Sequence, residues 1–230
     1  SDLILKICET PVIRVAVYGG SHVAEVFGAP NRKPSGSAAE KKQQRIEATR
    51  YEARTSLQTG ISQLTSLEIA NASIILEVVE KILNDILASD DIVFHIDQLR
   101  DLDAYLLDHS INVAILSVVM GIVSGFTRAE LQKLAVGAIL HDVGKLFLDQ
   151  DLVNRPGPLT AEEFSLIKYH SKLGSDLLKK FPEIDRESVE IALYHHERLD
   201  GSGYPSGLMG QEIAIFAQIV GIIDVFDALT

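Results

Sequence analysis

The chain has 230 residues, and its 21 lysines and arginines against 32 aspartates and glutamates give a formal net charge of −11. With 47% hydrophobic and 23% charged residues, the composition is that of a globular protein and excludes wholesale disorder. The acidic balance argues against nucleic-acid binding, which needs a basic surface, but bound metal ions can still attract a phosphorylated ligand. The single cysteine, Cys8, excludes an intrachain disulfide and a thiolate metal cluster.

Neither a membrane span nor a signal peptide is evident in the sequence. The longest uncharged stretch, 111–127, falls short of the roughly 20 apolar residues that a spanning helix needs. No charged segment followed by an apolar run and small residues opens the chain. The protein is therefore expected to be cytoplasmic and to have no membrane partner.

The first 30 residues differ in pattern from the rest of the chain. Several β-branched residues surround the turn sequence YGGS at 18–21, which predicts a small β-rich element over 1–30. The stretch GAPNRKPSGS at 28–37 is typical of a linker. SAAE at 37–40 then fits a capping box that opens a helix. We therefore predict a linker and a long helical segment over 31–90.

Between 38 and 88 the sequence predicts one long helix or a helix pair, because it holds no proline and one glycine. Apolar residues recur there at the three-or-four spacing of one helix face, namely Leu57, Ile61, Leu64, Ile75, Val79, Ile82 and Ile86. Two interpretations are open. The stripe could join two copies in a homodimer, or it could pack on the protein's own core.

From 97 onward the pattern is helical throughout. Two more capping boxes, TRAE at 127–130 and TAEE at 160–163, predict helices over 128–141 and 161–180. Further helices are expected over 187–196 and 211–230, with the tight loop GSGYP at 201–205 between them. The sequence therefore predicts a mainly α protein.

Seven residues of this helical region have the chemistry of metal ligands, namely His109, His141, Asp142, His170, His195, His196 and Asp224. Imidazole and carboxylate are ligands that suit iron, manganese and zinc. A lone histidine is more often a surface or hydrogen-bonded core residue, and His22 and His95 are interpreted in that way. The ordered series, rather than any one member, indicates a metal centre.

These residues fall in five blocks that resemble the HD-GYP family of metal-dependent phosphohydrolases. The blocks are HSINVA at 109–114, HDVGK at 141–145, YHSKLG at 169–174, HHERLDGSGYP at 195–205 and DVFDALT at 224–230. The resemblance covers 97–230 and implies a helical HD-domain bundle, here placed over 91–230, behind the long helix or helix pair and the small β-rich element. The family continues beyond this point with basic residues that contact phosphate, so the domain is expected to lack its C-terminal end.

The resemblance implies a phosphodiesterase that opens cyclic di-GMP to pGpG, and often on to GMP, with a metal-bridged hydroxide at a binuclear site. One divalent metal, iron or manganese, would be held by His109, His141, Asp142 and Asp224. The second would be held by Asp142, His170, His195 and His196, so that Asp142 bridges the pair. Two such cations can stabilise the charge that develops on a reacting phosphate.

The resemblance also assigns roles next to the metals. Asp142 and Lys145 are the expected catalytic residues, with Lys145 pointing at the substrate phosphate. Gly203, Tyr204 and Pro205 are expected to border the substrate or to contact a GGDEF-domain partner protein.

Three carboxylates near the blocks are not expected to be ligands. Asp227 and Glu197 are expected to hydrogen-bond the ligating imidazoles. Asp200 either orders its loop or is a plain turn residue. Some family members bind a third metal through a Glu one turn before the first His, where this chain has Tyr105. Asp101 and Asp108 lie at other spacings, so two metals are expected, and the reaction could end at pGpG.

Alternatives remain at this point. A mixed cyclic GMP-AMP could be the substrate, and the sequence does not separate it from cyclic di-GMP. The di-iron HD proteins include oxygenases, although the GYP block argues against that chemistry. The domain could also bind a nucleotide or a cyclase partner without turnover and signal through the 38–88 segment.

Overall fold

A computed structural model describes residues 37–66, 72–88 and 105–229 of the chain. The β-rich element predicted over 1–30 lies outside the described residues. Within the described ranges the protein is helical and has no β-strand, and its one isolated antiparallel bridge joins Asp200 to Met209. In these ranges no helix combines the length and the apolar run that crossing a membrane requires. The predicted mainly α fold is confirmed there, and the predicted domain boundaries stay predictions.

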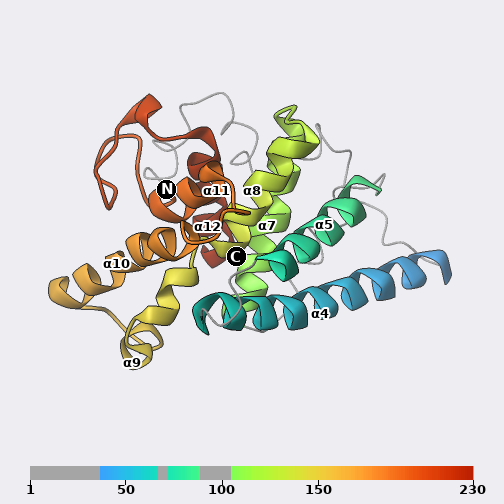
Figure 1. Cartoon of the computed structure of the whole chain (residues 1–230), viewed down its shortest axis with the longest axis horizontal. Helices are drawn as coiled ribbons and strands as arrows, with labels where there is room; N and C mark the ends of the chain where they lie inside the picture. Colours follow the sequence, from blue (N-terminus) through green and yellow to red (C-terminus); the bar gives the residue numbers. More distant parts are fainter. Residues whose placement is uncertain (1–36, 67–71, 89–104, 230) are drawn as a thin grey trace.

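The helices follow one another along the chain as Figure 1 shows. They are α4 (Ser37–Ser66), α5 (Ser73–Leu87), α7 (Tyr105–Val123), α8 (Arg128–Leu140), α9 (Gln150–Val153), α10 (Ala161–Leu178), α11 (Arg186–Tyr194) and α12 (Ile215–Leu229), with 3₁₀ turns η2 (Val143–Phe147) and η3 (Gly210–Glu212). In this view α4 runs along the lower edge with α5 and α7 above it, and α9 and α10 lie on the left.

The 38–88 segment forms the helix pair α4 and α5. Its apolar stripe is used within the chain, since α4 packs on α5 and α7, and α5 also packs on α8. Leu57, Leu64, Ile75 and Val79 are completely buried in the common core. The stripe therefore packs on the protein's own core, which was the second of the two interpretations. Because its apolar face is already covered, the stripe no longer supports the homodimer, which stays a prediction.

The two capping boxes of the later helices are both present. Thr127 accepts a hydrogen bond from the backbone N–H of Glu130, whose carboxylate accepts one from the N–H of Thr127 in return. Thr160 and Glu163 make the same reciprocal pair at the start of α10. Each box satisfies backbone donors that a helix start leaves open. The predicted starts of both helices are confirmed.

The last two predicted helices have different bounds in the structure. The expected 211–230 helix begins at Ile215, because Met209 and Glu212 first close the turn η3. There the N–H of Glu212 donates to the carbonyl of Met209 over 3.0 Å. The expected 187–196 helix ends at Tyr194, so the two histidines that follow lie at the point where the chain leaves the helix.

Two glycines bring the elements that carry the histidines into backbone contact. A Cβ at Gly144, on η2, would lie 1.9 Å from the carbonyl oxygen of His170 on α10. A Cβ at Gly221, on α12, would lie 2.2 Å from the carbonyl oxygen of His195. No side chain fits at these distances, so glycine at both positions allows α10, α12 and the end of α11 to converge.

Candidate metal centre and active site

The structure brings all seven predicted ligand residues together from five helical elements. His109 lies on α7, His170 on α10 and Asp224 on α12. The other four lie where helices end, with His141 and Asp142 directly after α8 and His195 and His196 directly after α11. The helices that carry these residues pack on one another or on η2, namely α7, α8, α10, α11 and α12. This packing brings the seven side chains together.

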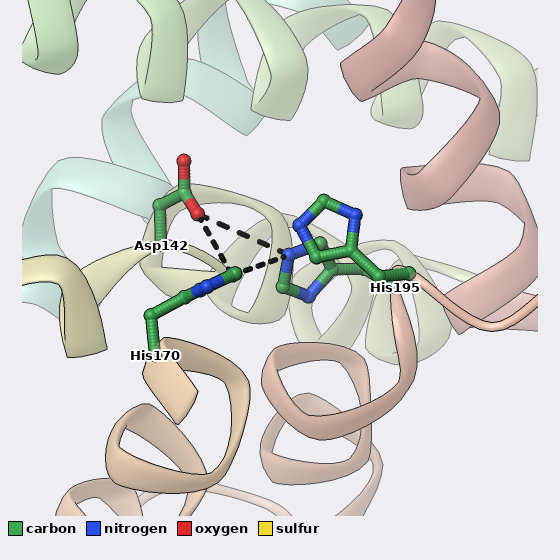
Figure 2. A group of neighbouring side chains, drawn as sticks. Asp142, His170 and His195 are labelled. Carbon is green, nitrogen blue, oxygen red and sulfur yellow. Dashed lines mark hydrogen bonds and ion pairs between the residues drawn. The ribbon is translucent and has the colours of Figure 1, made fainter. Parts of the chain in front are cut away.

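One group consists of Asp142, His170, His195 and His196, each of which offers a ligand atom within 4.8 Å of the others. The Oδ1 atom of Asp142 lies 3.3 Å from Nε2 of His170 and 3.9 Å from Nε2 of His195. The two imidazole Nε2 atoms are 3.4 Å apart. Figure 2 shows these three side chains pointing toward one another from separate elements. The four residues of this group are those expected around the second metal.

A second group consists of His109, His141 and Asp142, again with ligand atoms within 4.8 Å of one another. Asp224 completes it, since its Oδ1 lies 3.1 Å from Nε2 of His109 and 3.7 Å from Nε2 of His141. The Oδ2 atom of Asp142 lies 3.3 Å from Nε2 of His141. Asp142 therefore belongs to both groups and presents one oxygen to each.

The backbone orients three of the imidazoles. Nδ1 lies 2.7 Å from the carbonyl of Ala138 in His141 and 2.7 Å from the carbonyl of Ile167 in His170. In His195 it lies 3.1 Å from two carbonyls one turn back. A carbonyl can only accept, so Nδ1 carries the proton in each of these rings and donates it. In the neutral form of each ring, Nε2 is then a lone-pair donor that faces the cluster, as metal binding requires.

A carboxylate orients the fourth imidazole. Nδ1 of His109 lies 2.7 Å from Oδ2 of Asp227, one helical turn after Asp224 on α12. This contact agrees with the expectation that Asp227 hydrogen-bonds a ligating imidazole. It turns Nε2 of His109 toward Asp224.

Two polar atoms at the centre are buried without a hydrogen-bond partner in the described part of the chain. They are Nε2 of His141 and Oδ1 of Asp142. Leaving a polar group unpaired in a protein interior costs about 1–3 kcal/mol. A cation between the two groups would satisfy both atoms. The residues thus fit a bound metal.

The charges of the metal-free site follow from its burial. Burial lowers the pKa of His141, but Asp142 and Asp224 outweigh this effect and raise that pKa to about 10. Burial resists ionisation of the two aspartates, yet the facing histidines hold the pKa of each carboxyl well below its usual range. Both carboxylates are therefore ionised at neutral pH, and in the absence of metal the imidazolium of His141 balances their charge.

In the group of Asp142, His170, His195 and His196, the imidazoles are mostly neutral. Burial lowers the pKa of His170, with a smaller contribution from Lys145 and His141. Burial, followed by repulsion from His196 and His141, takes the pKa of His195 well below its usual range. Burial and repulsion from His170 lower the pKa of His196 to about 4. Neutral imidazole is the form that binds a metal. At neutral pH these three rings need not lose a proton before they do so.

Lys145 and Tyr204 border the cluster. The Nζ atom of Lys145 lies 2.5 Å from Oδ2 of Asp142. The ring of Tyr204 stacks on His196 with the centroids 4.6 Å apart. The next loop residues, Pro205 and Ser206, are exposed. The structure thus places Lys145 and Tyr204 beside the proposed ligands.

The loop after His196 is folded by its own carboxylates. Glu197 accepts backbone hydrogen bonds from Ser206 at 2.6 Å and Leu208 at 3.0 Å. The expectation that Glu197 bonds an imidazole is therefore wrong, because its oxygens are used to close the loop. Asp200 orders the loop through the N–H and hydroxyl of Ser202, at 2.9 and 2.6 Å.

Glycine is required at two positions inside this loop. Gly201 has a φ of +77°, in the left-handed region. A Cβ at Gly203 would lie 2.4 Å from the backbone nitrogen of Arg198. The loop therefore folds back on its own first residues, and this brings Tyr204 over His196.

Sequence reasoning missed the part that α4 plays beside His109. Arg50 of α4 hydrogen-bonds Asn112, and Arg54 pairs with Asp108 at 3.3 Å. The two partners flank His109 on α7. The carboxylate of Asp108 is thus paired with Arg54, and Asp108 belongs to neither ligand group. No sequence signal indicated these contacts, because they join segments that are distant along the chain.

A family model described as HD domain matches residues 81–230, and the chain belongs to this family. A cyclic di-GMP phosphodiesterase of Pseudomonas aeruginosa is 30% identical over 72% of this chain and 39% of its own length. The cyclic di-GMP phosphodiesterase response regulator RpfG of Xanthomonas campestris is 40% identical over 50% of this chain and 31% of its own. The chain thus spans well under half the length of these relatives.

The solved structure of an HDG"Y"P protein from Bdellovibrio bacteriovorus shares the fold, with a TM-score of 0.70 at 20% identity. The match covers 90% of this chain and 66% of that one. Together with the relatives, it confirms the resemblance to the HD-GYP proteins.

Proposed function

We propose that this chain is a metal-dependent phosphodiesterase that hydrolyses cyclic di-GMP to pGpG. The observation that carries the proposal is the position of Asp142, whose two oxygens face two separate groups of histidines. A shared carboxylate between two ligand groups is the arrangement of a binuclear centre. The similarity to proteins named cyclic di-GMP phosphodiesterases supplies the substrate.

We assign two divalent metals to the site, iron or manganese. His109, His141, Asp142 and Asp224 would hold one, and Asp142, His170, His195 and His196 the other. Imidazole with carboxylate suits these metals, and all seven proposed ligands are of these two types. Tyr105 replaces the Glu of a third site, so two metals rather than three are proposed, with pGpG as the product.

When bound, such a pair of metals polarises a phosphoryl oxygen and lowers the pKa of water. The chain's own residues orient the reaction. Lys145 reaches the cluster beside Asp142 and would offset the charge of the reacting phosphate. Tyr204, held against His196, would border the substrate. The carbonyls behind the imidazoles orient Nε2 toward the cluster, where the metals would bind.

A second substrate candidate comes from the relatives. Three similar proteins of Vibrio cholerae are named 3'3'-cGAMP-specific phosphodiesterases, and one is 42% identical over 45% of this chain. Cyclic GMP-AMP has the same phosphodiester ring and differs in one base. Binding of a GGDEF-domain protein at 201–205 is a further proposal, favoured by the exposure of Ser202 and Pro205.

The test joins metal analysis to turnover on one anaerobic sample. Metals per chain are measured by elemental analysis, and cyclic di-GMP and cyclic GMP-AMP hydrolysis is followed by chromatography. Two metals per chain with pGpG appearing supports the proposal. An Asp142→Ala variant with an unchanged circular dichroism spectrum should lose metal and activity together.

Other outcomes would redirect the proposal. Two metals with binding but no hydrolysis of either dinucleotide would indicate a receptor. Two metals with substrate-dependent oxygen consumption would indicate an oxygenase.

A further inference from the structure

A lysine ammonium lies over two aromatic rings beside the candidate metal centre. Nζ of Lys168, on α10, is 4.6 Å from the centroid of the Phe164 ring, one turn earlier on the same helix. It is also 5.4 Å from the centroid of the Tyr204 ring, which comes from the 201–205 loop. A cation at these distances is attracted to the ring faces. The two rings therefore hold the ammonium in place.

The rings connect this lysine to the second ligand group. Tyr204 stacks on His196 at 4.6 Å and meets His170 edge-on at 6.4 Å between centroids. Phe164 meets the same tyrosine edge-on at 6.1 Å and is 44% exposed. Lys168 is partly exposed as well. The ammonium thus lies at the rim of the cluster, where solvent reaches it.

Lys168 also differs from most cations of the described segments, which have a carboxylate partner. Lys145 is paired with Asp142, and Lys172, one turn after Lys168 on α10, is paired with Asp176 at 2.7 Å. Among the residues that the structure describes, no carboxylate lies within ion-pair distance of Lys168. In a chain with a net charge of −11, an ammonium left unneutralised beside the site is available to an anion.

We propose that Lys168 binds the second phosphate of a cyclic dinucleotide, the one that is not cleaved. This inference rests on the proposed function. A cyclic dinucleotide carries two phosphates on opposite sides of its ring, so a cation away from the metals is needed for the second one. The lysine ammonium is a compact point charge suited to phosphate, and the rings of Phe164 and Tyr204 keep it at the rim.

The experiment compares two lysine substitutions on one helix. Lys168→Met removes the proposed phosphate ligand, and Lys172→Met makes the same change one turn away. Each variant is assayed, metal-loaded, with cyclic di-GMP and with bis(p-nitrophenyl) phosphate, which has a single phosphate. We expect Lys168→Met to raise the KM for cyclic di-GMP about tenfold, the effect of one charge-assisted hydrogen bond, with kcat little changed.

The single-phosphate substrate is the internal control. Lys168→Met should leave its kcat/KM within about twofold, because the metal centre is intact. Lys172→Met should match wild type on both substrates, and Lys168→Arg should keep most of the affinity for cyclic di-GMP because it keeps the charge.

The outcomes separate this inference from the proposed function. If wild type cleaves cyclic di-GMP and Lys168→Met has the KM of Lys172→Met, the second-phosphate role is wrong and the phosphodiesterase stands. If wild type cleaves neither substrate, the proposed function fails. Calorimetric binding of cyclic di-GMP to wild type and Lys168→Met then decides the role of the lysine, since equal affinity would overturn it.

Discussion

The Nδ1 atom of His109 on α7 lies 2.7 Å from the Oδ2 atom of Asp227 on α12. The carboxylate fixes which ring nitrogen carries the proton and turns the other toward Asp224. It thus couples the packing of two helices to the direction of one proposed metal ligand. A side chain that does not itself bind the metal can control metal affinity in this way.

Replacing Asp227 by asparagine keeps the shape but removes the charge that supports the imidazole. We expect Asp227→Asn to weaken metal binding about 10- to 100-fold, the usual loss for such a supporting carboxylate. Competition with a chelator measures the affinity. Asp176→Asn, an exposed carboxylate paired with Lys172, is the matched control and should bind metal like wild type. Equal affinities in the two variants would contradict the supporting role.

Gly144 lies so close to the backbone of His170 that replacing it even with alanine should destabilise the fold. A methyl group 1.9 Å from a backbone carbonyl must push η2 away from α10. We expect Gly144→Ala to lower the free energy of unfolding by about 1–3 kcal/mol and to reduce metal content. Denaturant unfolding and elemental analysis measure the two effects.

Gly174→Ala is the control for this prediction, because a Cβ there has a longer contact with the backbone. Its Cβ would lie 3.2 Å from the nearest backbone atom, so a small adjustment accommodates it. Alanine also favours the helix there by about 1 kcal/mol relative to glycine. A loss as large as that of Gly144→Ala would show that contact distance does not set the cost.

Glu197 separates the fold of the 201–205 loop from the metal centre. Its carboxylate holds the backbone N–H groups of Ser206 and Leu208 and no imidazole. We expect Glu197→Ala to leave the metal content unchanged and to raise the KM for cyclic di-GMP, because Tyr204 is no longer held over His196. The freed loop should also be cut faster by trypsin at Arg198. Loss of metal in this variant would restore the role predicted from the sequence.

The stability of the metal-free protein should depend on pH through His141. Its pKa is raised to about 10 by the facing aspartates, against about 6.5 in an unfolded chain. Its stabilisation is therefore fully present below about pH 6.5 and is lost as the pH rises toward 10. The aspartates, with lowered pKa values, are ionised in both states over this range and add nothing to the slope.

We expect the free energy of unfolding in chelator to fall by an amount on the order of a few kcal/mol between pH 6.5 and 9.5. Urea denaturation at each pH measures it. A His141→Gln variant has no titrating imidazole at this position and should show a flatter profile, with a remaining slope from His109, whose pKa is also raised. The same slope in the variant would mean that another group carries the dependence.

The sequence alone determined the mainly helical fold, the two capping boxes and the series of ligand residues. Helix starts were predictable because the donors that Thr127 and Thr160 satisfy lie three residues away, within the same local segment. The family blocks were recognisable because each is a short contiguous string. Such information is local, and no tertiary contact is needed to read it.

Only the tertiary structure decided how those residues work together. That Asp142 faces two groups, that Glu197 closes a loop and that the 38–88 stripe packs inside the chain all depend on which helices meet. Spacing along the chain does not specify whether an apolar face is covered by the same molecule or by another. The carbonyls that orient the imidazoles and the rings that hold Lys168 leave no motif, because three-dimensional packing sets the direction in which each side chain points.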